Sequence, residues 1–406
     1  MKVVSFFFSV LIFSCHVDAQ EKCATHTYTL EQIRKNPSLK NKLDVIENYY
    51  LQKSESTVAA RIESTVITIP VVVHILYHDP SQKINDALVI AQVSELNKYF
   101  RRQNADTVNT PAVFKNLGAD CEIEFKLATS DPGRRNTNGI TRKYTPVNKW
   151  MADDKMKFSS ETGTDVWDPK SYLNIWVCNL DKFAGYSSVV GGPDNVDGIV
   201  IGTSAFVNGN KTIVHETGHW LNLKHLWGDE NCGDDGVSDT PKQASYTIGC
   251  PTTVRITCNN APAGDMYMNY MDFTNDACIN MFTLGQKARM RALLASGGVR
   301  NSLLQSKGLD APLFFDIPVP VEDPKWLQPK FYPNPAKNIL TIDLAYDYRW
   351  IGKTIFVTNL MGQSIMNVVI SSKVQTIDIS RLQPGMYVLA AKREDGVSIK
   401  QNFVKL

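Results

Sequence analysis

The chain has 406 residues, which leaves room for two or three domains at roughly 100–200 residues each. Hydrophobic residues make up 43% of it and charged residues 21%, a balance that favours a sizeable buried core over general disorder. The 43 basic and 41 acidic residues leave a net charge of +2, which argues against a nucleic-acid-binding protein. Because no apolar run reaches the roughly 20 residues that a membrane-spanning helix needs, we expect no transmembrane span.

Residues 1–19 are typical of a secretory signal peptide. Lys2 precedes an apolar run over residues 3–13, and Val17-Asp18-Ala19 supplies the small residues of a cleavage site. The alternative is a lipid-bearing Cys15, although Phe13 is bulky for the lipobox that such a cysteine requires. In both cases we expect export across the inner membrane to the extracellular space or the cell surface, where disulfides can form.

Helix and strand signals alternate through the first half of the chain. Residues 20–60 are polar and helix-prone, and a dense run of β-branched residues at 67–77 then predicts a strand. An amphipathic helix follows between Ile84 and Phe100. This alternation continues to about residue 220 and predicts an α/β domain, which we place at residues 61–309. Its later part is mostly loop, with a helix near Leu284–Leu294. The further strands expected in it are residues 123–128, 173–179 and 198–201.

A change of composition marks a second domain near the C-terminus. Five prolines between residues 310 and 330 predict a stiff linker, placed at residues 310–328, because proline blocks helices and central strands. Short strand-like runs separated by turns follow, which predicts a small all-β sandwich over residues 329–406. These runs are Ile339–Leu344, Thr354–Thr358, Ser364–Val369, Gln375–Ile379, Met386–Arg393 and Ser398–Val404.

The strongest chemical signal is His215-Glu216-Thr217-Gly218-His219. On a helix, residues four apart share a face, so the imidazoles of His215 and His219 can bind one metal ion. Zinc is the expected ion, since imidazole suits it and three protein ligands leave one position open for water. Glu216 is then placed to take a proton from the metal-bound water, whose pKa can fall to about 7. So short a motif also arises by chance, so the third ligand is decisive.

His225 is the best candidate for the third zinc ligand. It lies six residues after His219, so the helix must end and the chain must turn between them. Asn222 occupies that turn, and asparagine is one of the few residues other than glycine that tolerate a left-handed conformation. A downstream glutamate is the other common solution, but after Glu230 the next glutamate is Glu322, already in the linker.

The pattern His215-Glu216-x-x-His219-x-x-Asn222-x-x-His225 resembles the elongated zinc motif of the metzincin metalloproteases, with Asn222 in place of the usual glycine. Residues 269–278 resemble the Met-turn segment of the pappalysin family in its ulilysin-like branch, and Met271 would underlie the zinc site. The resemblance covers about residues 65–300. It implies a metzincin-like catalytic domain with a mixed twisted sheet, helices and a loop-rich C-terminal subdomain.

The same resemblance implies two substrate-binding features. Phe183–Ser187 resembles the edge strand that pairs with an extended substrate, through Ala184, Gly185 and Tyr186. Asp276 matches the base of the S1′ pocket, where a carboxylate would pair with a basic side chain. We therefore expect cleavage before Arg, or before Lys. A solvated loop aspartate is the alternative interpretation of Asp276.

One residue departs from the family pattern. Family members usually carry a tyrosine two residues after the Met-turn methionine, and its hydroxyl reaches the zinc or the oxyanion. This chain has Phe273 there, which cannot donate a hydrogen bond. Zinc would still stabilise the oxyanion, so we expect an active enzyme whose rate the lost donor can reduce, by about 100-fold where such a donor matters.

An acidic loop suggests a second metal site. Residues 229–239 contain five carboxylates and neither Lys nor Arg, so these groups repel one another unless a cation neutralises them. Calcium takes oxygen ligands in irregular loops, and the segment resembles the calcium loop of the family. A solvated acidic loop is the alternative. The expected calcium ligands are Glu230, Asp234, Asp235, Asp239 and Thr240.

Removal of the signal peptide leaves seven cysteines, so at least one lacks an intrachain partner. Four of them lie in a loop between residues 232 and 278, where two bridges are the economical arrangement. The resemblance implies the pairs Cys232–Cys258 and Cys250–Cys278. Cys121 and Cys178 either pair with each other or remain buried thiols.

Cys23 remains alone near the start of residues 20–60, which the resemblance identifies as a propeptide. Ulilysin-like zymogens use a cysteine here to fill the open position on zinc, and Ala24 replaces the usual glycine after it. An unpaired thiol without this role is the alternative. If the enzyme cuts before Arg, the Ala60–Arg61 bond is a candidate site of autolytic activation.

The last domain resembles the C-terminal sorting domain of type IX secretion cargo. The resemblance rests on Phe331–Asn338, Leu382–Val388 and Lys400–Leu406. It implies the type IX secretion machinery as a partner, whereas a plain β-sandwich binding module is the alternative.

Together these patterns predict a secreted zinc endopeptidase that is made as a latent precursor and acts on proteins or peptides. The competing class is a non-catalytic adhesin on a degenerate metzincin fold, which only Phe273 and Asn222 favour. A non-proteolytic zinc hydrolase is disfavoured by the edge strand and the Met-turn together.

Overall fold

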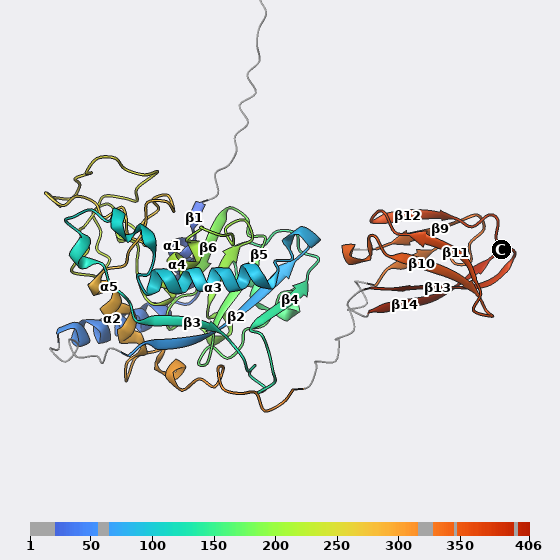
Figure 1. Cartoon of the computed structure of the whole chain (residues 1–406), viewed down its shortest axis with the longest axis horizontal. Helices are drawn as coiled ribbons and strands as arrows, with labels where there is room; N and C mark the ends of the chain where they lie inside the picture. Colours follow the sequence, from blue (N-terminus) through green and yellow to red (C-terminus); the bar gives the residue numbers. More distant parts are fainter. Residues whose placement is uncertain (1–20, 56–64, 316–327, 345–346, 394–396) are drawn as a thin grey trace, which may run out of the picture.

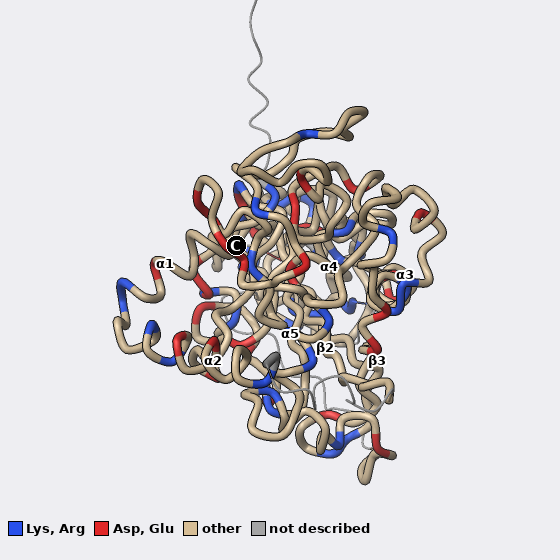
Figure 2. The backbone as a smooth tube through the Cα atoms, turned by 90° about the vertical axis from the view of Figure 1, so that its left-hand side faces the viewer, with Lys and Arg blue, Asp and Glu red and all other residues tan. Residues whose placement is uncertain are grey.

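The structure is a computed structural model that describes residues 21–55, 65–315, 328–344, 347–393 and 397–406 (Figure 1). The expected signal peptide, Cys15, the Ala60–Arg61 bond and most of the expected linker lie outside the described residues. No helix in the described ranges is long and apolar enough to cross a membrane. Basic and acidic residues are interspersed along the part of the chain drawn in Figure 2.

A mixed seven-stranded sheet forms the centre of the first domain (Figure 1). Its order is β1-β6-β7-β5-β2-β3, and β4 also pairs with β2. Strand β2 pairs in parallel with β3, β4 and β5, whereas β6 pairs antiparallel with β7. The bounds are β1 Glu21–Cys23, β2 Ile67–Tyr77, β3 Ile123–Leu127, β4 Ile140–Tyr144, β5 Leu173–Cys178, β6 Phe183–Ser187 and β7 Ile199–Gly202.

The long strand β2 shows why the sequence signal was strong there. Residues 69–77 are all buried, which is typical of a strand covered on both faces. Strand β4 was not predicted, because Thr141-Arg142-Lys143 carries no apolar pattern and its pairing with β2 is a long-range contact. Strand β1 was not predicted either, since three residues carry too little periodicity.

Five α-helices accompany this sheet in the described residues: α1 Thr25–Lys35, α2 Ser38–Glu55, α3 Asp86–Phe100, α4 Thr212–Trp220 and α5 Leu284–Leu294. Helix α5 has the predicted bounds, because the Thr283 side chain and Gln286 form a capping box at its start. Figure 1 shows α3 lying along the sheet. Residues of α3, α4, α5 and the central strands share the main hydrophobic core, together with Met271.

The N-terminal segment, residues 21–55, contacts this domain through β1, α1 and α2. Strand β1 extends the sheet beyond β6, and α2 packs beside α5 (Figure 1). Glu47 of α2 accepts a hydrogen bond from the buried Arg289 of α5 at 2.8 Å. The buried Tyr28 of α1 donates a hydrogen bond to Asp154 at 2.6 Å.

The C-terminal residues form two antiparallel sheets around a core of their own that includes Trp350 and Phe403. The sheet orders are β11-β10-β13-β14 and β12-β9-β8. All six predicted runs are strands, within one residue at each end. The bounds are β8 Lys330–Tyr332, β9 Ile339–Asp343, β10 Thr354–Asn359, β11 Ser364–Val369, β12 Val374–Asp378, β13 Gly385–Lys392 and β14 Ser398–Lys405.

Candidate active site

Helix α4 carries His215, Glu216 and His219, and its end is set by a left-handed residue. The helix finishes at Trp220, and Asn222 has φ 70°. This is the conformation predicted for Asn222, and it reverses the chain so that His225 returns to the side of the other two histidines. The N–H of Leu223 donates to the carbonyl of Gly218 at 2.9 Å and fixes the turn.

Backbone and carboxylate acceptors fix the orientation of the three imidazoles. His215 Nδ1 lies 2.7 Å from the carbonyl oxygen of Tyr270, and His219 Nδ1 lies 2.8 Å from that of Leu223. A carbonyl only accepts, so both Nδ1 atoms carry the proton and both Nε2 atoms keep a free lone pair. His225 Nδ1 lies 2.5 Å from Oδ1 of Asp229 in the same arrangement.

The three Nε2 atoms converge on one point. They lie 3.1–3.2 Å from one another, although none has a proton to share when every Nδ1 is protonated. Two nitrogens on a tetrahedral zinc ion are roughly 3.3 Å apart, so the spacing fits this ion. Burial lowers the pKa of His219 to about 3 and also lowers the pKa of His215, which keeps these ligands neutral.

Cys23 completes a four-ligand set. Its sulfur and one nitrogen of each histidine all lie within 4.8 Å of one another, and no other such group of His, Cys, Asp or Glu occurs in the described residues. Cys23 has no disulfide partner. Three imidazoles and a thiolate form a closed site of the kind zinc prefers, so the residues present fit this ion. Burial and the neighbouring Glu216 charge raise the pKa of the Cys23 thiol.

Glu216 lies beside the ligand cluster and is fully buried. Its Oε2 accepts a hydrogen bond from the Thr25 hydroxyl at 2.8 Å, while Oε1 has no partner. The same hydroxyl accepts from the N–H of Ser187 in β6 at 2.9 Å. Burial raises the pKa of Glu216 to about 8, which is appropriate for a group that takes up and returns a proton near neutral pH.

Met271 packs directly beneath α4, as the Met-turn resemblance implies. A Cβ at Gly218 would lie 2.6 Å from the Met271 sulfur, so a larger residue there would force Met271 to move. Phe273 lies against the site, with its ring 4.9 Å from the His225 ring and 5.6 Å from the His215 ring. Trp227 stacks on His225 at 4.4 Å, so an aromatic wall shields the candidate ligands.

Strand β6 pairs along one edge with β1 of the N-terminal segment. Gly185 pairs with Cys23 in a parallel ladder, and the N–H of Ala24 donates to the Gly185 carbonyl at 3.0 Å. A Cβ at Gly185 would lie 3.0 Å from the Cγ of Glu216, so the edge passes close to the candidate base. Tyr186 points away from this edge and its hydroxyl donates to Asp154 at 3.0 Å.

Asp276 lines a pocket next to His215, together with Phe273, Lys211 and Lys22. The Lys22 ammonium donates to the carbonyl of Thr274. Burial lowers the pKa of Lys22, while the charges of Asp276 and Asp272 act in the opposite direction. Burial raises the pKa of Asp276.

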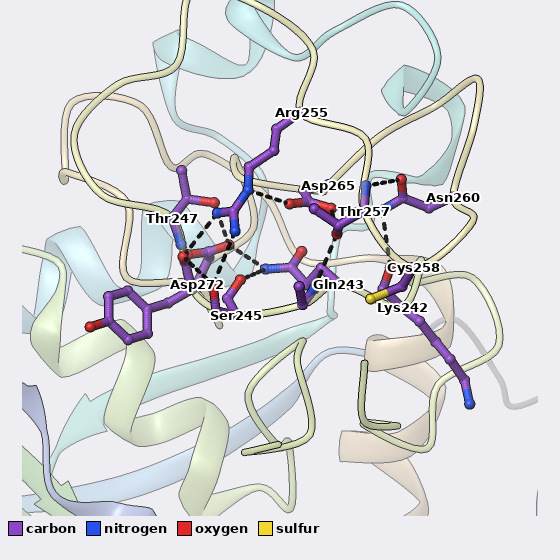
Figure 3. Close-up of polar contacts among 12 residues, drawn as sticks. Lys242, Gln243, Ser245, Thr247, Arg255, Thr257, Cys258, Asn260, Asp265 and Asp272 are labelled. Carbon is purple, nitrogen blue, oxygen red and sulfur yellow. Dashed lines mark hydrogen bonds and ion pairs between the residues drawn. The ribbon is translucent and has the colours of Figure 1, made fainter. Parts of the chain in front are cut away.

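The loop between α4 and α5 has no regular strand or helix and is held by cross-links. Both disulfides of the predicted pairing, Cys232–Cys258 and Cys250–Cys278, are present. Figure 3 shows the polar network that accompanies them: Asp272 accepts from Gln243 and from the N–H of Thr247, each at 2.7 Å. These bonds fix the segment that carries Met271 and Phe273. Cys121 and Cys178 are buried thiols that do not pair with each other.

The acidic loop does not bring its carboxylates to one point. Asp235 accepts from the Thr240 hydroxyl at 2.8 Å, and Asp239 accepts from the N–H of Gly285 at 2.8 Å at the start of α5. Asp234 pairs instead with Lys242 at 3.2 Å. Burial raises the pKa of Asp235 to about 7. The calcium site therefore stays a prediction.

A buried ion pair anchors the end of α4. Arg300 donates to both carboxylate oxygens of Asp197 at 2.8 Å, and its Nε donates to the carbonyl of Trp220 at 3.0 Å. The Trp220 indole also donates to Asp197 at 3.1 Å. The residue next to His219 is thus fixed to the core.

Asp197→Ala is expected to lower the free energy of unfolding of the first domain by about 3–5 kcal/mol, because it leaves Arg300 buried and unpaired. Urea unfolding followed by tryptophan fluorescence measures this change. Asp194→Ala is the matched control, since Asp194 pairs with Lys170 at the surface at 3.8 Å and should change stability little. Equal effects of both substitutions would contradict this role for Asp197.

Sequence reasoning missed several contacts of the site. It counted Asp229 among the acidic loop residues and in a family-typical Trp227-Gly228-Asp229, but gave it no contact. The structure places the carboxylate of Asp229 against His225 Nδ1 and 3.2 Å from Nδ1 of His26. Sequence reasoning also missed Lys22 and Thr25, which flank Cys23. The only sign in the sequence that Lys22 and Thr25 belong to the site was their position near Cys23, because no motif links them to Asp276 or Glu216.

The fold and the convergent histidines define a metzincin-like zinc metalloprotease, and the comparisons agree. Residues 157–295 match the model of the pregnancy-associated plasma protein-A peptidase family, and residues 330–405 match that of the secretion system C-terminal sorting domain. An extracellular metalloprotease of Pyricularia oryzae is 46% identical over 253 residues, which cover 60% of this chain and 79% of that protein. A match to an extracellular metalloprotease of Verticillium alfalfae, 38% identical, covers 30% of this chain and 43% of that protein.

Mirolysin of Tannerella forsythia is similar in structure as well. A promirolysin mutant is 42% identical with a TM-score of 0.64, over 70% of this chain and 97% of that one. Mature mirolysin in complex with a cleaved peptide is 44% identical with a TM-score of 0.58, over 59% of this chain and 96% of that one. The chain belongs to the pregnancy-associated plasma protein-A (pappalysin) family of metalloproteases and carries a type IX secretion sorting domain. The prediction of a secreted metalloendopeptidase, rather than an adhesin, is confirmed.

Proposed function

We propose that the enzyme is made latent and cleaves proteins before Arg or Lys by a mechanism that uses Glu216 as the general base. The observation that carries this proposal is the convergence of three Nε2 atoms beside a buried carboxyl group, next to the edge of β6 that β1 occupies. His215, His219 and His225 would hold the zinc ion. Bound there, zinc supplies Lewis-acid activation of the attacking water and of the substrate carbonyl.

Glu216 is the group that moves the proton. Its Oε1 is free of protein partners, so it can accept the proton of the attacking water and pass it to the leaving amine. The raised pKa of Glu216 favours the uptake step, since a more basic carboxylate is a stronger acceptor for the proton of the attacking water. Phe273 cannot donate a hydrogen bond to the oxyanion, so we assign stabilisation of the oxyanion to no side chain.

The substrate would bind as an extended strand on β6. Backbone groups of Ala184, Gly185 and Tyr186 would form the ladder, as the N-terminal segment does with Gly185. The basic side chain after the scissile bond would enter the pocket that Asp276 lines. The peptide complex of mature mirolysin supports peptide binding in a relative.

We further propose that residues 20–60 are the propeptide of a catalytic domain at residues 61–309. Cys23 would occupy the fourth position on zinc, and β1 covers the edge that the substrate would use. Residues 1–19 would be the signal peptide, residues 310–328 a linker and residues 329–406 the sorting domain. The existence of a promirolysin form in a close structural relative supports latency.

A structural calcium ion near Asp235 is part of the same proposal. The five carboxylates of residues 229–239, with no Lys or Arg among them, support it, because a cation would neutralise their repulsion. Glu230, Asp234, Asp239 and Thr240 would supply further oxygen ligands after a rearrangement of the loop.

Zinc removal tests the proposed function. The activated full-length protein is expected to cleave casein, to lose this activity with 1,10-phenanthroline, and to regain it with added Zn²⁺. Peptide products sequenced by mass spectrometry should begin with Arg or Lys. A folded, zinc-loaded and activated protein that cleaves no substrate would refute the proposal, whereas cleavage without a basic preference would refute only the role of Asp276.

A further inference from the structure

We propose that Lys22 is an inhibitory ligand of the Asp276 pocket, so that the segment following Glu21 acts as a peptide inhibitor that carries its own specificity residue. The inference rests on the proposed function, because the pocket is the one assigned to the basic residue of the substrate. The contact of Lys22 adds the specificity pocket to the candidate metal site as a place where the segment blocks the enzyme. The inference therefore predicts that this segment also inhibits as a separate peptide.

The position of the Lys22 side chain is the first observation. It lines the pocket with Asp276 and Phe273, and its ammonium donates to the carbonyl of Thr274. The carboxylates of Asp276 and Asp272 act electrostatically on the same ammonium. Asp272 is already saturated by Gln243 and Thr247 (Figure 3), which leaves Asp276 as the acceptor open to a ligand.

The course of the segment is the second observation. Strand β1 lies parallel to β6 and pairs Cys23 with Gly185, so the segment uses the same strand edge as the proposed substrate. The atom that it presents to the three histidines is the Cys23 sulfur. A thiol at that place offers no carbonyl carbon for attack, so the segment can fill the cleft without being cleaved there.

The neighbouring contact with Glu216 is the third observation. The Thr25 hydroxyl donates to Glu216 Oε2 at 2.8 Å and is itself held by the N–H of Ser187. Within four residues the segment therefore occupies the specificity pocket, the ligand cluster and the candidate base. Because the contacts of Lys22, Cys23 and Thr25 lie so close together in sequence, a short peptide can make most of them. Helix α1 adds the hydrogen bond from Tyr28 to Asp154.

The first test uses peptides of residues 21–36 as inhibitors of the activated full-length protein. All peptides keep Cys23 and carry Lys, Met or Arg at position 22. We expect Lys22→Met to raise the inhibition constant roughly tenfold, the size of one charge-assisted hydrogen bond. Lys22→Arg should inhibit at least as well as Lys, because a guanidinium can engage Asp276 in bidentate geometry.

A double-mutant cycle assigns the effect to the pocket. On the Asp276→Asn enzyme, the Lys and Met peptides should inhibit almost equally. Direct binding of fluorescein-labelled peptides, measured by anisotropy, gives the same comparison without relying on turnover. Equal inhibition by Lys and Met peptides on the unmodified enzyme would overturn the inference and leave Cys23 as the source of latency.

The second test uses the intact precursor. Lys22→Met should accelerate the appearance of activity roughly tenfold, whereas Lys22→Arg should not. Lys42→Met is the matched control, since Lys42 is an exposed lysine of the same segment. If the activated protein shows no peptidase activity at all, the proposed function fails. If it is active and Lys22→Met matches the unmodified precursor in both tests, only this inference fails.

Discussion

Replacing Glu216 by alanine is expected to lower kcat/KM for protein substrates by about 10²–10⁴-fold, the usual contribution of a general acid–base group. The physical reason is that Glu216 is the carboxyl group beside the three converging Nε2 atoms and has one oxygen free of partners. The zinc content, measured by inductively coupled plasma mass spectrometry, should not change, because Glu216 is outside the ligand set.

The control for this experiment is Glu161→Ala, which removes an exposed glutamate from the same domain and should leave kcat/KM within about twofold. The fold of both variants can be compared by circular dichroism. A Glu216→Ala enzyme that binds zinc and keeps a third or more of its activity would show that another group moves the proton.

Replacing Asp276 by asparagine is expected to reduce cleavage before Arg by about 10–100-fold, while cleavage before uncharged residues changes little. The carboxylate offers a charged acceptor in a pocket that already holds a lysine ammonium, and charge-assisted hydrogen bonds contribute about 1.5–3 kcal/mol. The measurement is kcat/KM for a matched pair of peptides that carry Arg or Leu after the scissile bond. Asp194→Asn is the control, because Asp194 is a surface residue outside the pocket.

The same peptide pair gives a pH test. Burial raises the pKa of Asp276, so the carboxyl group becomes protonated at a higher pH than an ordinary aspartate does. A protonated carboxyl group loses its attraction for a cation, so the Arg-to-Leu preference should fall as the pH is lowered through this pKa. A preference that depends neither on pH nor on Asp276 would place the specificity determinant elsewhere.

Local sequence carried most of the information about the ligand cluster. The i, i+4 spacing of His215 and His219 is a property of one helix, and Asn222 with φ 70° returns His225 within six residues. The alternation of apolar residues likewise predicted the strands of the C-terminal sandwich, because burial of one face of each strand has a period of two. The helix predicted near Leu284–Leu294 is α5, and the structure shows a capping box of Thr283 and Gln286 at its start.

The sequence therefore indicated the class of enzyme, the candidate metal ligands and base, and the division into a protease and a sorting domain. Its family resemblance implied the two disulfide pairs, which the structure contains. Only the tertiary structure decided which atoms orient the imidazoles, that β1 pairs with β6, and that Lys22 enters the pocket of Asp276. Lys22 and Thr274 are 252 residues apart in sequence. Contacts of this range depend on how the sheet edge, the disulfide-linked loop and the N-terminal segment pack together, and no local periodicity encodes that packing.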